Sequence, residues 1–518
     1  MPRSFIFLVA LLSVLSYVHG ETVVLTPAPE PQTGLKAIIE KWKADELARQ
    51  GGKFGDHGWW PWGLEAFDYD NDGDLDLIAQ HHGAPRSMVL RNELIEKGTL
   101  SFVNANAELG LPAQALSGCF RPQVWDIDGD GFLDLAYCDA MPNTVWFNKG
   151  GKSFEPMGYG IGQLDHVMPY RDLNGDGIPD AMSHRTKSKY LFDPAARTFK
   201  REPYEEPLYE RTPEAIAGLL AELKQDPKNR FLKLSYLEHG DLNGDGIEDL
   251  VACGFGSYGG ASFGRFLLGD KSGNFSDATD ALGLPKDGTP VQLSDVNADG
   301  RDDVLIVGLG LYVSDPAGRF ALKPGPLTEF LKARGPYAHK VYATDLNDDG
   351  RTDFAISNAR SKTEVVYESL GGGEFREVVR SGGWDADPVV ICDIDNDGAE
   401  DVCFGGPGET VTLLLNRTAK RGHGVSIRLR MDKPNPFALG AVLEIYKAGE
   451  LGKPGARPIR RADAPANGLP IHAGLGEAAA FDLRATFPGQ TPKTVELKGV
   501  EAKPRLTLTP DGKLEEAK

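Results

Sequence analysis

The chain has 518 residues, of which 41% are hydrophobic and 25% are charged, and this composition excludes a largely disordered protein. Its 62 glycines and 35 prolines favour many short strands joined by turns over long helices. The net charge of −19 excludes a protein that binds nucleic acid through a basic surface.

Residues 1–20 have the three parts of a secretory signal peptide. Arg3 supplies the positive charge, an apolar stretch runs over Phe5–Val18, and residues 18–20 form a cleavage site of the required kind before Glu21. The alternative is a membrane anchor, but this apolar stretch is too short to cross about 30 Å of hydrocarbon as a helix. We therefore expect a secreted, periplasmic or cell-surface protein without a membrane span.

Residues 21–50 are expected to form an N-terminal extension that contains a helix over Leu35–Arg49, which ends before Gly51 and Gly52. A second helix is expected further along the chain, in an insertion at about residues 205–230. There Thr212 is a suitable N-cap, and Pro213 occupies the first helical position.

A nine-residue motif, Asp-x-[Asp/Asn]-x-Asp-Gly-x-x-Asp, occurs seven times along the chain. Side chains at positions 1, 3, 5 and 9 and the main-chain carbonyl at position 7 offer the oxygen ligands that Ca²⁺ prefers, and the glycine at position 6 lets the backbone turn around the ion. The sequence therefore predicts up to seven calcium sites. The predicted ligands are Asp68, Asp70, Asp72, Asp74 and Asp76; Asp126, Asp128, Asp130, Phe132 and Asp134; Asp172, Asn174, Asp176, Ile178 and Asp180; Asp241, Asn243, Asp245, Ile247 and Asp249; Asp295, Asn297, Asp299, Arg301 and Asp303; Asp345, Asn347, Asp349, Arg351 and Asp353; and Asp393, Asp395, Asp397, Ala399 and Asp401.

Two other interpretations of the motif are an EF-hand and a metal-free turn. An EF-hand needs a bidentate Glu at position 12 and flanking helices, whereas position 12 is Ala, Tyr, Ser, Ile or Phe here and the flanks alternate as strands do. Metal-free Asp-Gly turns do occur, but seven complete ligand sets favour calcium. Seven bound Ca²⁺ would contribute +14 and change the net charge from −19 to −5. Most of the negative charge is therefore explained by the predicted metal-binding loops.

Successive motifs begin 46 to 69 residues apart, with several strand-like runs between them. This spacing predicts an all-β fold, a seven-bladed β-propeller over residues 51–416 with calcium-binding inter-strand loops. A glycine turn followed by Phe ends most repeats but not the seventh, and the same phrase occurs earlier, at Gly51–Phe54. We therefore expect the N-terminal segment to supply the outer strand of the last blade.

The number of cysteines, five, is odd, which leaves at least one unpaired. Cys119 with Cys138, and Cys392 with Cys403, could bridge neighbouring strands, and Cys253 would then be a free thiol. The alternative is that all five are buried thiols that pack as small hydrophobic residues.

The motifs resemble the FG-GAP/VCBS repeat family, whose integrin α-subunit members form seven-bladed propellers with calcium in some blades. Fragments of the FG-GAP motif, after which the family is named, occur after the first loop, at residues 83–85, and after the seventh, at residues 404–407. Residues 417–518 resemble a diverged ASPIC/UnbV module in the segments 422–427, 438–441, 472–476 and 487–489, and are expected to form a small β-rich domain. This combination is similar to the cartilage-acidic-protein-like family of secreted proteins, a resemblance that implies extracellular binding or adhesion.

Several aromatic and basic residues lie just before the loops and could approach a central channel, where they could bind a sugar, an anion or a second metal. The alternative is that each packs between blades. The commonest hydrolase and zinc signatures do not occur in the sequence, and the segment 254–259, which fits G-x-G-x-x-G, is expected to be an inter-strand turn. The candidate channel residues are His57, His166, His239, His339, Trp59, Trp60, Trp62 and Arg121.

The sequence thus favours a non-enzymatic, secreted calcium-binding propeller that binds a protein or a glycan, with structural calcium and no catalytic residue assigned. The alternative is a polysaccharide-active lyase or hydrolase that uses the channel mouth, since His, Arg and Tyr can act there as acid and base. A periplasmic assembly factor is a third possibility.

Overall fold

The computed structural model describes residues 23–30, 32–49, 51–53, 61–81, 87–111, 123–137, 144–157, 167–183, 188–203, 233–247, 249–255, 262–272, 274–287, 289–332, 339–358, 363–382, 389–405, 411–419 and 421–516. The predicted signal peptide at residues 1–20 and the predicted insertion at residues 205–230 lie outside these ranges. Within them, no helix is long and apolar enough to cross a membrane.

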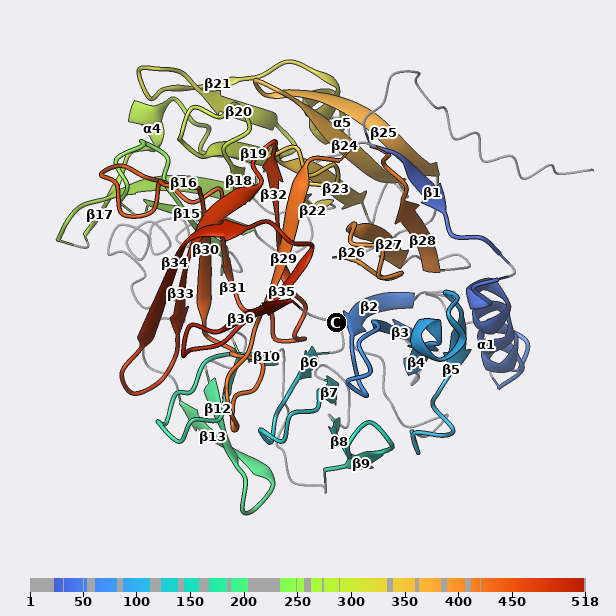
Figure 1. Cartoon of the computed structure of the whole chain (residues 1–518). Helices are drawn as coiled ribbons and strands as arrows, with labels where there is room; N and C mark the ends of the chain where they lie inside the picture. The colour runs from blue at the N-terminus through green and yellow to red at the C-terminus, as the bar shows by residue number, and fades with distance from the viewer. Residues whose placement is uncertain are drawn as a thin grey trace, which may run out of the picture.

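Seven four-stranded antiparallel sheets succeed one another around the molecule (Figure 1). In six of them the four strands are consecutive in the chain, which is the arrangement of propeller blades. The strands are β2 (Pro61–Phe67), β3 (Asp76–His81), β4 (Ser87–Asn92) and β5 (Phe102–Asn104); β6 (Gln123–Trp125), β7 (Asp134–Tyr137), β8 (Thr144–Asn148) and β9 (Phe154–Pro156); β10 (Val167–Pro169), β11 (Ala181–Ser183), β12 (Ser188–Asp193) and β13 (Thr198–Pro203); β14 (Lys233–Gly240), β15 (Asp249–Phe255), β16 (Ser262–Gly269) and β17 (Phe275–Asp277); β18 (Thr289–Ser294), β19 (Asp303–Val307), β20 (Gly310–Ser314) and β21 (Phe320–Leu322); β22 (His339–Thr344), β23 (Asp353–Asn358), β24 (Thr363–Gly371) and β25 (Glu374–Gly382); and β26 (Val389–Cys392), β27 (Asp401–Gly405) and β28 (Val411–Asn416).

The seventh sheet takes its outer strand from the other end of the chain. Strand β1 (Leu25–Pro27) pairs antiparallel with β28, with Leu25 opposite Asn416 and Pro27 opposite Leu414. The N-terminal segment thus supplies this strand, but not through the glycine-Phe phrase that suggested it. Residues 51–53 form a turn after the helix, and Phe54 lies outside the described residues. The predicted position was wrong because Leu25–Pro27 already occupies the free edge of β28.

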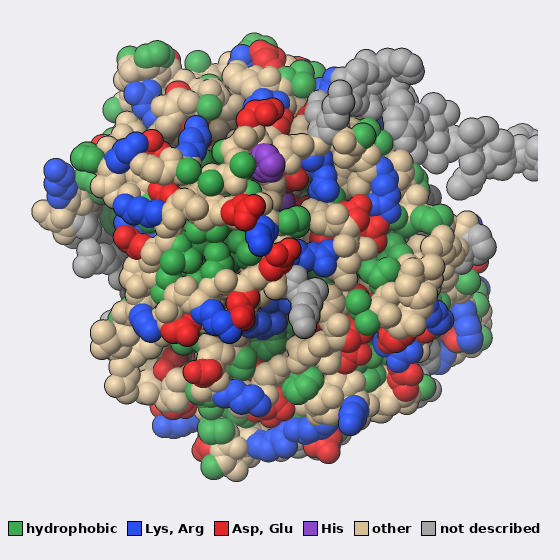
Figure 2. Space-filling view, viewed as in Figure 1, with side chains coloured by type: hydrophobic (Ala, Val, Ile, Leu, Met, Phe, Trp, Pro, Cys, Tyr) green, Lys and Arg blue, Asp and Glu red, His purple; other side chains and the backbone are tan. Residues whose placement is uncertain are grey.

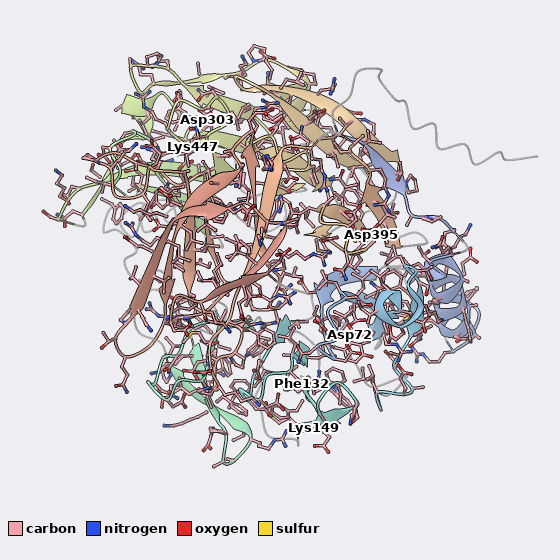
Figure 3. The ribbon with its side chains drawn as sticks, viewed as in Figure 1. Asp72, Phe132, Lys149, Asp303, Asp395 and Lys447 are labelled. Carbon is pink, nitrogen blue, oxygen red and sulfur yellow. The ribbon has the colours of Figure 1, made fainter. Side chains whose placement is uncertain are left out.

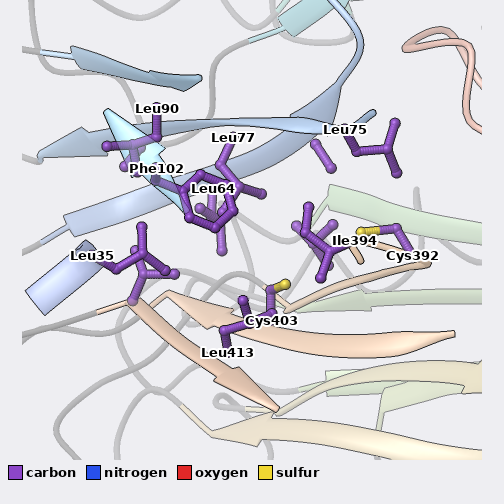
Figure 4. Close-up of a cluster of buried hydrophobic side chains, with 14 of the residues drawn as sticks. Leu35, Leu64, Leu75, Leu77, Leu90, Phe102, Cys392, Ile394, Cys403 and Leu413 are labelled. Atoms are coloured by element: carbon purple, nitrogen blue, oxygen red, sulfur yellow. The ribbon is translucent and has the colours of Figure 1, made fainter. Parts of the chain in front are cut away.

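Neighbouring sheets pack face to face through buried side chains. One cluster joins helix α1 (Leu35–Arg49), the first sheet and the seventh sheet, and includes Leu35, Leu77 and Leu413 (Figure 4). Similar clusters join the first sheet to the second and the sixth to the seventh. Strand β2 also contacts β26 and β27, so the first and last sheets are neighbours in space.

Residues 423–516 form a separate pair of four-stranded sheets, drawn in orange and red in Figure 1. Their strand orders are β32-β29-β35-β36 and β31-β30-β33-β34, and one apolar cluster, which includes Val425 and Phe481, draws residues from both sheets. The bounds are β29 (His423–Leu429), β30 (Val442–Lys447), β31 (Arg460–Asp463), β32 (Ile471–Gly476), β33 (Ala480–Phe487), β34 (Lys493–Glu501), β35 (Arg505–Leu508) and β36 (Leu514–Glu516).

Short helices lie in the outer connections of the propeller: α2 (Leu94–Lys97), α4 (Thr279–Leu282) and α5 (Pro326–Lys332). The G-x-G-x-x-G segment begins at the end of β15 and leads to its antiparallel partner β16, as expected for an inter-strand connection.

Among the described cysteines, Cys392 and Cys403 are free, buried thiols, and Cys253 is buried as well. The suggested Cys392–Cys403 bridge is not formed, although the two residues are diagonal neighbours on β26 and β27 and their side chains interact as thiols. Cys119 and Cys138 lie outside the described residues.

Candidate metal centre

Each acidic motif forms the loop between the first and second strands of one sheet, so the seven loops are equivalent in position. The glycine at position 6 has φ between 77° and 102° in every loop, a region that strongly favours glycine. Position 4 is also left-handed in every loop, including the non-glycine residues Asn71, Ala298, Asp348 and Asn396. The sequence motif did not reveal this second turn position, because no single residue type marks it: Asn, Asp, Ala and Gly all occur there.

Backbone hydrogen bonds hold the acidic side chains at positions 1 and 5. In loops 2–7 the N–H of the position-6 glycine donates to the carboxylate at position 1 over 2.7–3.0 Å, as Gly131 does to Asp126. In all seven loops the N–H at position 7 donates to the carboxylate at position 5 over 2.8–3.0 Å, as Phe132 does to Asp130. The loops are therefore ordered by their own side chains.

The carboxylate at position 9 has a role that the motif alone did not reveal. In every loop one oxygen accepts the N–H of position 2 and the other accepts an N–H near the end of the third strand, over 2.6–3.3 Å. This side chain thus links loop, second strand and third strand. The third-strand donors are Asn92, Asn148, Phe192, Gly269, Ser314, Ser369 and Asn416.

Three loops bring the carboxylates at positions 1, 3 and 9 together, with one oxygen from each residue within 4.8 Å of the others. In two of them the carboxylate at position 3 has a buried oxygen without a hydrogen-bond partner, namely Asp128 and Asp395, and in the seventh loop Asp393 has another. A buried carboxylate oxygen without a donor is costly unless a cation or water satisfies it. The three groups are Asp68, Asp70 and Asp76; Asp126, Asp128 and Asp134; and Asp393, Asp395 and Asp401.

Burial and mutual repulsion raise the pKa values of carboxyl groups in all three groups. Burial raises the pKa of Asp70 to about 6 and that of Asp126 to about 7, and neighbouring carboxylates add to both shifts. Burial likewise raises the pKa of Asp401 to about 8. Clustered carboxylate oxygens of this kind are the ligand set that Ca²⁺ takes. The residues present therefore fit a calcium ion in loops 1, 2 and 7.

Among the described residues, the carboxylates of loops 3, 4, 5 and 6 form no group of three, although the amide oxygen at position 3 of these predicted ligand sets can still bind a cation. In each of them position 3 is Asn, so one negative charge is missing. In loops 3–5 the amide of that Asn donates to the carboxylate at position 5 over 2.9–3.1 Å, as Asn174 does to Asp176. The amide N–H thus gives the position-5 carboxylate a hydrogen-bond donor.

Basic side chains also approach some loops. Arg505 donates to Asp393 over 2.7 Å, Arg417 contacts both Asp395 and Asp397, and Arg457 contacts Asp241. Among the described residues, loops 2, 4, 6 and 7 have such ion pairs, whereas the carboxylates of loops 1, 3 and 5 have none. Figure 3 labels Asp72 of loop 1 and Asp395 of loop 7 on neighbouring sheets.

The C-terminal domain contacts the loops directly. A Cβ on Gly474 would lie 1.9 Å from Asp345 Oδ2, and a Cβ on Gly424 would lie 2.3 Å from Asp348 Oδ1. The imidazole of His472 lies 2.8 Å from Asp348, and its pKa, lowered by burial, is raised overall to about 9 by nearby carboxylates. Only glycine can occupy these strand positions at this distance. In Figure 2, acidic and basic side chains are intermingled on the face that carries this domain.

A cavity of about 540 Å³ lies between the propeller and the C-terminal domain. Strands β22 and β26 line one side and β31 and β32 the other, with Glu400, Arg460 and His472 among the charged groups. The candidate channel residues predicted from the sequence lie outside the described side chains. The sequence did not reveal this cavity, because its walls come from separate domains.

The family model of the FG-GAP-like repeat matches residues 126–183, 241–306 and 311–417. These stretches hold six of the seven acidic motifs, and the first motif lies before them. The successive four-stranded sheets and the matched repeats support an all-β propeller with FG-GAP-like repeats. A comparison with curated proteins gives no match.

Solved structures with a similar trace include a lectin from Agrocybe aegerita that recognises non-reducing terminal N-acetylglucosamine, with 17% identity, a TM-score of 0.34, and coverage of 62% of this chain and 80% of the lectin. The exotype rhamnogalacturonan lyase YesX has 15% identity, a TM-score of 0.27, and coverage of 94% and 77%. The Dos1 propeller has 9% identity, a TM-score of 0.30, and coverage of 70% and 96%. These likenesses assign no ligand or reaction to this chain.

Proposed function

We propose that this protein is a secreted, seven-bladed β-propeller that binds calcium and serves as a binding module for an extracellular protein or glycan. The observation that carries the calcium proposal is the set of three carboxylate groups at loops 1, 2 and 7, with buried oxygens that lack partners in loops 2 and 7. In this proposal the other loops take calcium more weakly, up to seven ions in all. Residues 417–518 would form an ASPIC/UnbV-like module.

Calcium has a structural role in this proposal. Each group of ligands includes the position-9 carboxylate, which also links the loop to the second and third strands of its sheet. An ion that binds only the folded state stabilises it by RT ln(1 + [L]/Kd), about 2.7 kcal/mol at a hundredfold excess over Kd. Calcium would therefore rigidify the blades and the surface that they present.

Thermal unfolding of the mature protein with Ca²⁺, with Mg²⁺ and with EGTA tests the calcium proposal. We expect the Tm to fall in EGTA, to recover with Ca²⁺, and to recover less with Mg²⁺, which demands a stricter octahedral geometry. An unchanged Tm together with no calcium in elemental analysis would refute it. Pull-down and glycan-array binding, each in Ca²⁺ and in EGTA, test the ligand class.

The alternative of a polysaccharide lyase or hydrolase at the channel mouth stays a prediction, since it depends on side chains that lie outside the described ones. A reducing-end assay on a panel of polysaccharides tests it. Activity that disappears in His166→Ala or His339→Ala would favour the enzyme over the binding module.

A further inference from the structure

The first loop differs from the other six at position 7. This position is Asp74 in loop 1, and Phe132, Ile178, Ile247, Arg301, Arg351 and Ala399 in the others. Asp74 is only 1% exposed, although it lies in a loop. A buried carboxylate at this position requires a compensating partner.

Asp74 belongs to a second group of acidic residues. One oxygen each from Asp72, Asp74 and Glu96 lie within 4.8 Å of one another, and none of these residues belongs to the group of Asp68, Asp70 and Asp76 in the same loop. Glu96 comes from helix α2, which follows the third strand of the sheet and lies outside the repeat motif. Two separate segments therefore converge on this point.

The hydrogen bonds of Asp74 leave one oxygen free for a ligand. Its Oδ2 accepts the N–H of Ile95 at the start of α2 over 2.9 Å. Its Oδ1 is buried and has no hydrogen-bond partner. The contact with Ile95 explains why the side chain is fixed in place, but it does not explain the unpartnered oxygen.

The nearby basic group does not neutralise this cluster. The guanidinium Nε of Arg91 lies 3.8 Å from Glu96, and Arg91 also pairs with Glu93 and with Glu108. The cluster therefore retains an excess of negative charge.

We propose that Asp72, Asp74 and Glu96 form a second divalent-cation site on the first blade, beside the one in its repeat loop. Three carboxylates with water completing the shell suit Ca²⁺, which accepts six to eight oxygens in irregular geometry. Asp72, predicted from the motif as a ligand of the loop ion, serves this second ion instead. The site goes beyond the proposed function, because its ligand Glu96 lies outside the repeat motif. Among the described residues, no other loop combines a carboxylate at position 7 with a neighbouring acidic residue.

Calcium titration of the metal-stripped full-length protein by calorimetry, with Glu96→Gln as the main variant, tests the proposal. Glu96 is about half exposed, so this variant should fold, and its Tm in EGTA checks this. Glu108→Gln is the matched control, because it removes an equally exposed partner of Arg91 that lies outside the cluster. We expect Glu96→Gln to lose one calcium equivalent, or to weaken one by tenfold or more, and Glu108→Gln to match the wild type.

Asp74→Asn is a second variant, whose amide oxygen can still accept the N–H of Ile95. It should lose the same equivalent as Glu96→Gln, and the double variant should lose no further one. An unchanged titration of Glu96→Gln would overturn the second site and leave calcium binding by the repeat loops intact. A wild type that binds no calcium would overturn both.

Discussion

The side-chain amide of Asn92 donates a hydrogen bond over 3.1 Å to the carbonyl of Ile394, 302 residues further along the chain. Asn148 and Asn416 make the same bond to Tyr69 and Leu346, over 2.7 Å each. In each case an Asn that ends a third strand reaches the acidic loop of the preceding sheet. The first and seventh sheets are therefore joined in the same way as sheets that are neighbours in sequence.

Replacing Asn92 with Ala should destabilise the protein by about 2–3 kcal/mol, because the buried carbonyls of Leu75 and Ile394 both lose their donor. Urea unfolding in Ca²⁺ measures this change. Asn104→Ala is the control, since that exposed side chain bonds only to the nearby Asn106 N–H. Equal effects of the two variants would mean that the bond between the first and seventh sheets contributes nothing.

Strand β1 should be required for the stability of the whole propeller. Leu25 is 2% exposed and packs in the cluster between the sixth and seventh sheets, so Leu25→Ala should cost about 2–4 kcal/mol. Pro27→Ala, at an exposed position of the same strand, should change the free energy of unfolding by less than about 0.5 kcal/mol. A wild-type melting curve for Leu25→Ala would show that β1 is dispensable.

The position-9 carboxylates should stabilise the fold without any metal. Asp303 accepts the N–H of Val296 and of Ser314 over 3.1 and 2.8 Å, and an amide can accept only one of them. Asp303→Asn should therefore cost about 1–3 kcal/mol in EGTA. Asp315→Asn, in an exposed turn, is the control. A loss seen only with calcium present would show that Asp303 acts solely as a ligand.

The seven loops should not bind calcium equally. Asp128→Asn removes a carboxylate from one of the three grouped loops and should eliminate one high-affinity equivalent in a calorimetric titration. Asn174→Ala alters a loop that forms no group and should leave the high-affinity equivalents unchanged. If both variants lost the same class of site, the division of the loops by their position-3 residue would be wrong.

The close contact of the C-terminal domain with loop 6 should tolerate only glycine. Gly474→Ala places a methyl group against Asp345 and should cost about 1–3 kcal/mol, with faster proteolysis between the propeller and the C-terminal domain. Shortening the opposing side chain in Gly474→Ala with Asp345→Ala should recover part of the loss. If Gly474→Ala were cleaved at the same rate as the wild type, the close contact would be contradicted.

The sequence by itself determined the features that lie within short stretches of chain. The strands on either side of each loop, helix α1 and the oxygen-rich loops follow from alternation, capping and a nine-residue motif, which are local properties. The motif spacing also predicted the succession of sheets, because each repeat is one unit of four strands. The FG-GAP-like matches to residues 126–183, 241–306 and 311–417 agree with that interpretation.

Only the tertiary structure decided which distant groups meet. The outer strand is Leu25–Pro27 and not the segment at Gly51, because pairing with β28 depends on residues almost 400 positions away. The convergence of Glu96 on Asp74 and the approach of Gly474 to Asp345 likewise join separate segments. A side chain's burial and its contacts across sheets are set by packing, and no local pattern of residues encodes them.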